Sequence, residues 1–332
     1  MPQNDDYRLI LNGAALAEPM RRGLLAVSGA DRASYLQGLF TNDIQALAAG
    51  AGCYAAWLTP QGRMTTDMHV LEAGDMILLD VPLATTASVL ERLDQLIFSE
   101  DVILGDLSGE IAHVGLHGPL APGVIERTLT GADGLTDWPQ YRNIRAARGS
   151  AQVVVARMDQ LGVPGFVLYA GRDVEEDLRR ALEAQGGRAV GPEAVAAARV
   201  EAGYPLFGTD LTDDIIPLEA GIEGRAISFD KGCYVGQEVV IRVLHRGHGR
   251  VARKFVGVMF EGQEAVPVAT PINVGGREVG FVTSSAVSPA RGSIALGYVH
   301  RDFLKAGSPV EAEWAGRISR GAVSALPFPA VN

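Results

Sequence analysis

The stretch from Pro217 to Lys254 reads PLEAGIEGRAISFDKGCYVGQEVVIRVLHRGHGRVARK and is the most distinctive part of the chain. It holds one of the two cysteines, Cys233, and several glycines. Residues 225–254 carry seven basic side chains against two acidic ones, a local charge of +5 in a chain whose net charge is −10. A cysteine in such an electropositive, Gly-rich segment is predicted to be exposed and reactive. The alternative is a small buried thiol beside a turn, with the arginines on a solvated face.

The residues from Lys231 to Glu238, KGCYVGQE, resemble the signature of the YgfZ family of folate-binding proteins, which are linked to the maintenance of iron–sulfur enzymes. The resemblance implies that Cys233 is the catalytic residue and that Lys231 and Tyr234 contact the folate. It also implies that iron–sulfur client or assembly proteins are partners, with a link to tRNA modification.

Two further motifs are similar to those of the glycine-cleavage T-protein, an aminomethyltransferase that uses tetrahydrofolate and shares the YgfZ fold. They are RVEAG, from Arg199 to Gly203, and TDLTDDIIPLEAG, from Thr209 to Gly221. The glutamate of the first motif holds the pterin ring in that family, so the resemblance implies that Glu201, with Arg199, binds folate. A carboxylate suits this role because it can accept two hydrogen bonds from a pterin. The alternative is that Glu201 pairs with Arg199 or faces water at a helix end.

The segment PQGRMTTDMHVL resembles the T-protein hairpin that leads to a pair of aspartates, one of which assists methylene transfer near the folate nitrogens. Thr66 and Asp67 align with this pair, so one acid is retained. The resemblance implies that Asp67 is both catalytic and folate-binding. His69 is expected on the same face of the strand as Asp67, because side chains alternate along a strand. The alternative is that Asp67 faces solvent or pairs with Arg63.

The composition predicts a globular protein without membrane contact. The chain has 332 residues, of which 47% are hydrophobic and 20% charged, enough for two or three domains. No apolar run reaches the roughly 18 residues of a membrane span, and the acidic N-terminal segment does not resemble a signal peptide. Two distant cysteines without a CxxC motif fit a reducing compartment. We therefore expect a cytoplasmic protein, and a monomer is favoured.

No metal site is predicted, because His245 and His248 lie in a Gly/Arg loop that gives only a weak metal signal beside Cys233. The net negative charge makes nucleic acid an improbable partner. The basic arm from Arg242 to Lys254 also lacks the interleaved aromatic residues of a platform for single strands. The polyglutamate tail of folate or an acidic partner protein explains this arm equally well.

The order of elements predicts an α+β fold. Runs of strands followed by a helix occur twice, which indicates two related α/β units with antiparallel sheets. The expected elements are strands at 54–59, 66–71, 76–81, 151–157 and 165–170, and helices at 84–98 and 173–185. Asp31 is expected to N-cap an earlier helix. Beyond about residue 250, short strands alternate with Gly/Pro turns, which is typical of a small β-barrel. The predicted domains are residues 1–248, which bind folate, and residues 249–332, the C-terminal barrel.

Two functions follow from the resemblances. The favoured one is a folate-binding accessory protein that supports assembly or repair of iron–sulfur clusters, using a tetrahydrofolate site and the thiol of Cys233. The alternative is a tetrahydrofolate-dependent aminomethyltransferase or other one-carbon transferase. The cysteine motif favours the first, because the T-protein has no counterpart to it. A third function, tRNA recognition through the basic arm, carries little weight.

Overall fold

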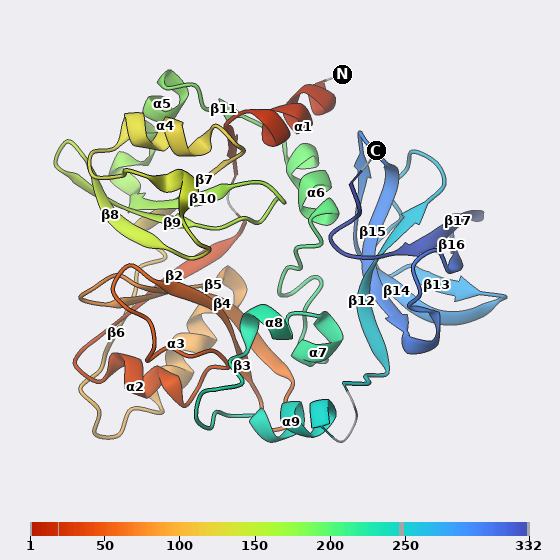
Figure 1. The fold of residues 1–332 in the computed structure, drawn as a ribbon, viewed down its shortest axis with the longest axis horizontal. Helices are drawn as coiled ribbons and strands as arrows, with labels where there is room; N and C mark the ends of the chain where they lie inside the picture. The colour runs from red at the N-terminus through yellow and green to blue at the C-terminus, as the bar shows by residue number, and fades with distance from the viewer. Residues whose placement is uncertain (1, 19, 246–248, 331–332) are drawn as a thin grey trace.

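The computed structural model describes residues 2–18, 20–245 and 249–330, and over these residues the chain forms two sheet-and-helix units and a closed barrel. Figure 1 shows the two units one above the other and the barrel beside them, with α6 to α8 between the units and the barrel. The helices are α1 (Pro2–Asn12), α2 (Arg32–Gln37), α3 (Thr86–Asp94), α4 (Ala121–Thr128), α5 (Glu175–Ala184), α6 (Pro192–Glu201), α7 (Pro217–Ala220), α8 (Glu223–Ala226) and α9 (Gln237–His245). The strands of the units are β1 (Ala15–Ala17), β2 (Arg22–Ser28), β3 (Gly52–Leu58), β4 (Met64–Glu72), β5 (Ile77–Pro82), β6 (Ile103–Asp106), β7 (Ile111–His117), β8 (Asn143–Arg148), β9 (Ala151–Arg157), β10 (Gly165–Gly171) and β11 (Arg188–Ala189). The barrel strands are β12 (Arg253–Phe260), β13 (Pro271–Val274), β14 (Arg277–Ser288), β15 (Gly292–His300), β16 (Pro309–Trp314) and β17 (Arg317–Ser324).

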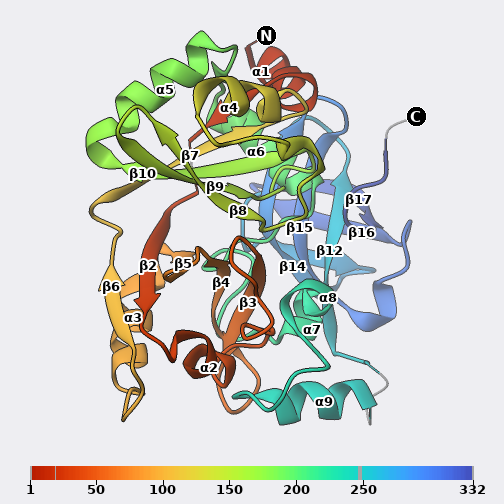
Figure 2. The ribbon, with the colours of Figure 1, turned by 60° about the vertical axis from the view of Figure 1, so that its left-hand side comes forward.

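The first unit is an antiparallel sheet in the order β3-β4-β5-β2-β6, with α2 and α3 on one face. Every residue of β5 is buried, because helices cover one face of the sheet and the second unit covers the other. The second unit has the order β11-β1-β7-β10-β9-β8, with α4 and α5 on its outer face. The two sheets therefore meet through their inner faces (Figure 2).

The contact between the two sheets is apolar in one part and polar in another. Leu24 and Leu78 of the first sheet belong to one buried cluster with Val167 and Tyr169 of the second. The hydroxyl of Tyr169 also donates to the carboxylate of Asp80 on β5, at 2.5 Å. Charged side chains on the inner face of the first sheet are thus sealed between the two units.

The barrel is closed in the order β12-β15-β14-β13-β16-β17 and packs on α6. Arg199 on α6 donates to Ser284 of β14 at 2.9 Å and to the carboxylate of Asp210 at 3.0 Å. Thr283 donates to Asp210 at 2.5 Å, and the hydroxyl of Tyr298 donates to the backbone carbonyl of the same residue at 3.0 Å. Buried hydrogen bonds therefore fix the position of the barrel relative to the first domain.

The predicted fold class, two antiparallel α/β units followed by a C-terminal barrel, is confirmed. The helix α1 has no counterpart among the expected elements. The predicted boundary at 248/249 adjoins residues 246–248, which lie outside the described residues, and the first barrel strand begins at Arg253. No helix in the described ranges is long and apolar enough to cross a membrane.

Candidate functional site

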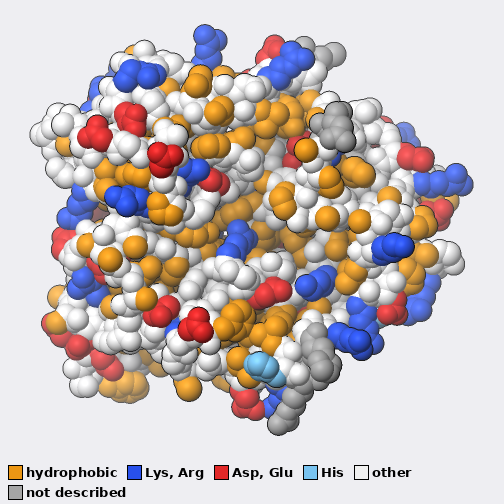
Figure 3. Space-filling model, in the orientation of Figure 1, with side chains coloured by type: hydrophobic (Ala, Val, Ile, Leu, Met, Phe, Trp, Pro, Cys, Tyr) orange, Lys and Arg blue, Asp and Glu red, His pale blue; other side chains and the backbone are white. Residues whose placement is uncertain are grey.

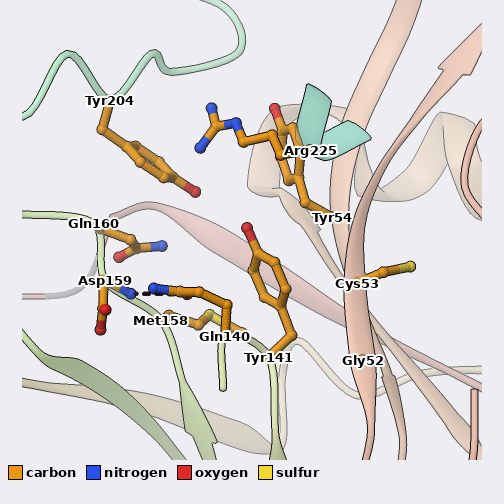
Figure 4. A pocket seen from close by; sticks show the side chains of 10 residues that line it. All are labelled: Gly52, Cys53, Tyr54, Gln140, Tyr141, Met158, Asp159, Gln160, Tyr204 and Arg225. Carbon is orange, nitrogen blue, oxygen red and sulfur yellow. Dashed lines mark hydrogen bonds between the residues drawn. The ribbon is translucent and has the colours of Figure 1, made fainter. Parts of the chain in front are cut away.

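A pocket of about 400 Å³ opens where the two units and the segment after α6 meet (Figure 4). Figure 4 shows the side chains of Tyr54, Tyr141, Tyr204 and Arg225 around a common space, with the amides of Gln140 and Gln160 at its lower edge. The lining residues are Gly52, Cys53, Tyr54, Gln140, Tyr141, Met158, Asp159, Gln160, Tyr204 and Arg225. Aromatic walls with a few polar groups are typical of sites for small planar ligands.

Each tyrosine comes from a different element. Tyr54 lies on β3 of the first unit, Tyr141 precedes β8 of the second, and Tyr204 follows α6. Tyr141 has a φ of 64°, which is uncommon for a bulky residue; residues in such strained conformations cluster at functional sites. Its N–H donates to the carbonyl of Arg157 at 2.9 Å, and its ring stacks on His69 with centroids 5.7 Å apart. The surrounding structure thus holds this ring in an otherwise unfavourable backbone conformation.

Behind the tyrosines lies a buried cluster of charged side chains centred on Arg22. Its guanidinium donates to Asp67 at 3.2 Å and also binds the carboxylate of Asp80. Burial alone would raise the pKa of Asp80, but Arg22, His69 and His113 together hold it well below its usual range. Asp80 is therefore ionised and neutralised by Arg22, which explains how these groups remain in the interior.

Asp67 and His69 lie on the same face of β4 and both contact Arg22, as the strand pattern predicted. The carboxylate of Asp67 accepts from Arg22 and, at 2.8 Å, from the hydroxyl of Tyr54, so it lies behind the pocket wall and not on its lining. The alternative prediction that Asp67 faces solvent or pairs with Arg63 is wrong, because Asp67 is 2% exposed and Arg63 pairs with Asp214. Its predicted roles in catalysis and in folate binding stay predictions.

Thr66, the residue in place of the second acid, points to the other face of β4. Its hydroxyl contacts that of Thr85 at 3.0 Å and is buried there. Because neighbouring side chains alternate along a strand, an acid at this position would not reach the pocket. The loss of this acid therefore says little about the chemistry of the pocket.

His69 connects the charged cluster to the pocket. Its Nε2 lies 2.8 Å from the hydroxyl of Tyr204, and its Nδ1 lies 3.4 Å from the guanidinium of Arg22, which only donates. Burial and the positive charge of Arg22 lower the pKa of His69, so the ring is neutral. Nδ1 also lies 3.6 Å from the carboxylate of Asp80, so it has both a donor and an acceptor beside it, and the structure is compatible with the proton on either ring nitrogen. In both tautomers the hydrogen bond between Nε2 and the hydroxyl fixes the position of the Tyr204 ring at the pocket.

Both pocket hydroxyls are held by buried partners. Tyr54 uses its proton on Asp67 and keeps acceptor capacity, and the hydroxyl of Tyr204 is hydrogen-bonded to Nε2 of His69. Burial raises the pKa of both tyrosines, so both are neutral near pH 7. With the amides of Gln140 and Gln160, this set matches the mixed donors and acceptors of a heteroaromatic ring.

Glu201 and Arg199, predicted to bind folate, face the barrel side of α6. Glu201 accepts from the hydroxyl of Tyr7 at 2.7 Å and lies 3.8 Å from Arg291, while its Oε1 is buried without a hydrogen-bond partner among the described residues. Arg199 donates hydrogen bonds to Asp210 and to Ser284 of the barrel. Neither lines the tyrosine pocket, and their predicted contact with folate stays a prediction.

Lys231 and Tyr234 of the KGCYVGQE motif hold this segment on the first unit. The ammonium of Lys231 is buried and donates to the carbonyls of Gln37, Phe40 and Asn42, at 2.6, 2.8 and 2.7 Å. These three bonds use all its protons, so none is left to donate to a folate. The ring of Tyr234 is buried beneath the ammonium.

The predicted exposure of Cys233 is confirmed, and its reactivity stays a prediction. Among the glycines, Gly236 has a φ of 84°, and a Cβ there would lie 2.6 Å from the carbonyl of Thr59. It thus permits close approach to the β3–β4 hairpin and not to a ligand. Cys53 is buried, and burial raises its pKa to about 12.

No metal-binding cluster of His, Cys, Asp or Glu occurs among the described residues, and His248 lies outside them. The basic arm is described only in part. Arg242 pairs with Glu238 on α9, and Lys254 lies 3.9 Å from Glu223.

Tyr54, Tyr141, Tyr204 and Arg225 were not among the residues predicted from the sequence. Their positions are far apart in the chain and share no local motif. The available signals were weak: a tyrosine in the apolar strand GCYAAWL, and another directly after RVEAG.

The chain matches the family model of the GCVT N-terminal domain over residues 3–231 and that of the glycine cleavage T-protein C-terminal barrel domain over residues 253–329. It is 28% identical over 334 residues to an aminomethyltransferase of Streptomyces avermitilis, covering 98% of this chain and 89% of that protein. It is 30% identical over 295 residues to an aminomethyltransferase of Rubrobacter xylanophilus, covering 89% and 78%. The crystal structure of glycine cleavage system aminomethyltransferase T from Bartonella henselae superposes with a TM-score of 0.87 at 21% identity, covering 98% of this chain and 89% of that one.

Both the sheet domain and the barrel therefore define the class of protein as one with the T-protein fold. The chain belongs to the glycine cleavage T-protein family. The predicted resemblance to the T-protein is confirmed. The finer prediction of a YgfZ protein is not confirmed by these matches, which favour the aminomethyltransferase alternative.

Proposed function

We propose that the protein binds a reduced folate in the tyrosine pocket and acts as a tetrahydrofolate-dependent one-carbon transferase of the aminomethyltransferase kind. The observation that carries this proposal is the pocket itself, which combines three tyrosine rings, two amides and an arginine. It occurs in a family whose curated relatives are named aminomethyltransferases. Planar rings stack on tyrosine, and the amides and hydroxyls supply directional contacts.

When bound, the reduced folate supplies ring nitrogens that carry the one-carbon unit. The residues of this chain orient it. Tyr204 is held by His69 and Tyr54 by Asp67, and the Tyr54 hydroxyl, whose proton is used on Asp67, can accept a hydrogen bond from the ligand. Arg22 fixes both supporting groups, so the hydroxyls are preorganised before a ligand arrives.

The test is turnover with an aminomethyl-lipoyl donor and tetrahydrofolate, comparing wild type with Asp67→Asn. The Asn side chain fills the same space but weakens the hold on Arg22 and on Tyr54. We expect folate-dependent turnover in wild type and a loss of roughly 10- to 100-fold in the variant. The absence of turnover in a wild-type protein that binds folate would contradict the transferase activity while leaving the binding site intact.

A second candidate function is favoured by Cys233. The other residues of the motif have structural contacts, namely Lys231, Tyr234 and Gly236. Cys233, by contrast, is exposed, and no structural contact explains why a cysteine stands at this position. This supports the predicted accessory role, in which an accessible thiol serves iron–sulfur enzymes while the folate site is retained. The clients are not identified by the chain.

A cell-based replacement separates the two functions. If the accessory role is correct, Cys233→Ala loses iron–sulfur enzyme activity in cells, whereas the purified variant binds folate like wild type. Full iron–sulfur enzyme activity with Cys233→Ala would remove this candidate.

A further inference from the structure

Arg225 is half-buried and, unlike Arg22 and Arg199, has no carboxylate partner among the described residues. Its guanidinium lies 4.5 Å from the ring centroid of Tyr54 and 4.9 Å from that of Tyr204, so it is held between two aromatic faces. Across the described part of the chain, its side chain makes no hydrogen bond and no ion pair. By contrast, Arg22 and Arg199 each bind aspartate.

Two acids close to Arg225 in the fold or in the chain, Asp67 and Glu223, do not pair with it. Asp67 accepts from Arg22 and Tyr54, and Glu223, two residues before Arg225, lies 3.9 Å from Lys254. A guanidinium has five N–H donors arranged to bind a carboxylate through two parallel bonds. An arginine fixed by aromatic faces, with these donors unused, is therefore preorganised for an anion from outside the chain.

Arg225 also stands where two cavities meet. It lines the tyrosine pocket and a groove of about 370 Å³ between the α7–α8 segment and the barrel, whose other basic residue is Lys254. Lys254 in turn lines a surface pocket with Arg250 and Arg301. Figure 3 shows a hollow in the middle of this face, lined largely by hydrophobic side chains, with basic side chains gathered toward the barrel. Positive charge thus increases from the aromatic pocket outward.

We propose that Arg225 binds a carboxylate of the ligand whose planar ring lies in the tyrosine pocket, and that it directs the anionic tail of this ligand into the groove toward Lys254. The inference rests on the proposed function, since a reduced folate has a ring at one end and a glutamyl carboxylate at the other. By this inference one side chain, Arg225, distinguishes a folate, which has the carboxylate, from a free pterin, which lacks it.

The test compares two ligands on Arg225→Gln, Arg225→Lys and wild type by calorimetry. The ligands are 5-formyltetrahydrofolate, which carries the glutamyl tail, and 6-methyltetrahydropterin, which has only the ring. We expect Arg225→Gln to weaken the first roughly 10- to 100-fold, because charge-assisted hydrogen bonds are lost, and the second by less than about threefold. Arg225→Lys should recover part of the loss, since it restores the charge without the planar fork. Arg142→Gln, an exposed arginine next to Tyr141, is the matched control and should change neither affinity.

Equal losses for both ligands with Arg225→Gln would overturn the inference, because Arg225 would then only shape the pocket. Unchanged affinity for 5-formyltetrahydrofolate in both variants would overturn it as well. If wild type binds neither ligand, the proposed function itself fails. The melting temperature of each variant is measured alongside, and Arg225→Lys carries the comparison if Arg225→Gln does not fold.

Discussion

At the scale of single residues, Lys231 shows why a motif does not reveal the role of each of its members. Its position before Cys233 suggested an activating cation, but its ammonium donates to three carbonyls, one at the last residue of α2 and two in the loop after it. The C-terminal turn of a helix leaves backbone carbonyls without partners inside the helix. A buried ammonium has three protons and can donate a hydrogen bond to each of three carbonyls. Burial lowers the pKa of Lys231 to about 8, which is compatible with a charged ammonium at neutral pH.

We predict that Lys231→Met lowers the free energy of unfolding by roughly 2–4 kcal/mol, because three buried carbonyls lose their partner. Denaturant unfolding measures this difference. Lys305→Met, which removes an exposed lysine, should change it by less than about 0.5 kcal/mol. Equal stability of the two variants would show that the contacts of Lys231 do not matter.

We predict that Cys233 reacts with iodoacetamide in the native protein, whereas Cys53 reacts only after unfolding. Cys233 is exposed, and Cys53 is a buried thiol whose pKa is raised by burial to about 12. Mass spectrometry of labelled native protein distinguishes the two sites, with Cys53→Ala and Cys233→Ala as controls. Labelling of Cys233 only in denaturant would contradict the exposed position.

At the scale of elements, the strands β4 and β7 bury histidines that the fold keeps neutral. Burial lowers the pKa of His69, His113 and His117, and that of His117 falls to about 4. The unfolded chain binds a proton to each near pH 6.5, so it binds more protons than the native state below this pH. The stability contributed by neutral histidines is therefore complete above pH 6.5 and lost as the pH falls toward 4.

We predict that the free energy of unfolding decreases between pH 6.5 and pH 4, with at most about 3 kcal/mol from His117, as its pKa shift implies. Urea unfolding across this range measures the slope. His117→Asn should make the slope shallower, because one of the neutral histidines is removed. A slope unchanged by this substitution would contradict the role of His117.

The elements themselves were largely predictable, but their ends were not. The helix expected over 84–98 is α3 at Thr86–Asp94, preceded by a short 3-10 turn. Asp31 does precede α2, yet its carboxylate accepts from the N–H of Asp101 and does not cap the helix. The carboxylate of Asp31 therefore binds an N–H that is distant in the sequence and not an N–H of the first turn of α2.

At the scale of the whole molecule, the antiparallel units and the barrel followed from strand patterns and turn residues. The central pocket did not, because Tyr54, Tyr141 and Tyr204 meet only when both units and the segment after α6 are in place. Asp67 was found through family resemblance, but its contacts with Arg22 and Tyr54 depend on tertiary packing that no spacing encodes. Sequence patterns indicate the local periodicity of single helices and strands. They do not indicate which residues of different units come together in a shared site.

We predict that Asp210 is essential for docking of the barrel. It is 1% exposed, binds Arg199, and accepts from Thr283 of the barrel. Asp210→Ala leaves Arg199 buried and unpaired and should cost roughly 3–5 kcal/mol of stability. Calorimetric melting measures the loss, and Asp213→Ala, at an exposed acid, should leave it within about 0.5 kcal/mol. Adding Arg199→Met to Asp210→Ala should recover part of the stability, and the absence of any recovery would contradict this pairing.

The central claim, that a reduced folate binds between the tyrosines, is tested most directly by the dissociation constant of 5-formyltetrahydrofolate for wild type and for Tyr204→Leu. The substitution removes both a stacking face and the hydroxyl that His69 holds toward the pocket. We predict measurable binding in wild type and an affinity at least about tenfold weaker in the variant, since stacking of one ring on an aromatic side chain contributes about 1–3 kcal/mol. Absence of binding in wild type, or equal affinity in the two proteins, would contradict the claim.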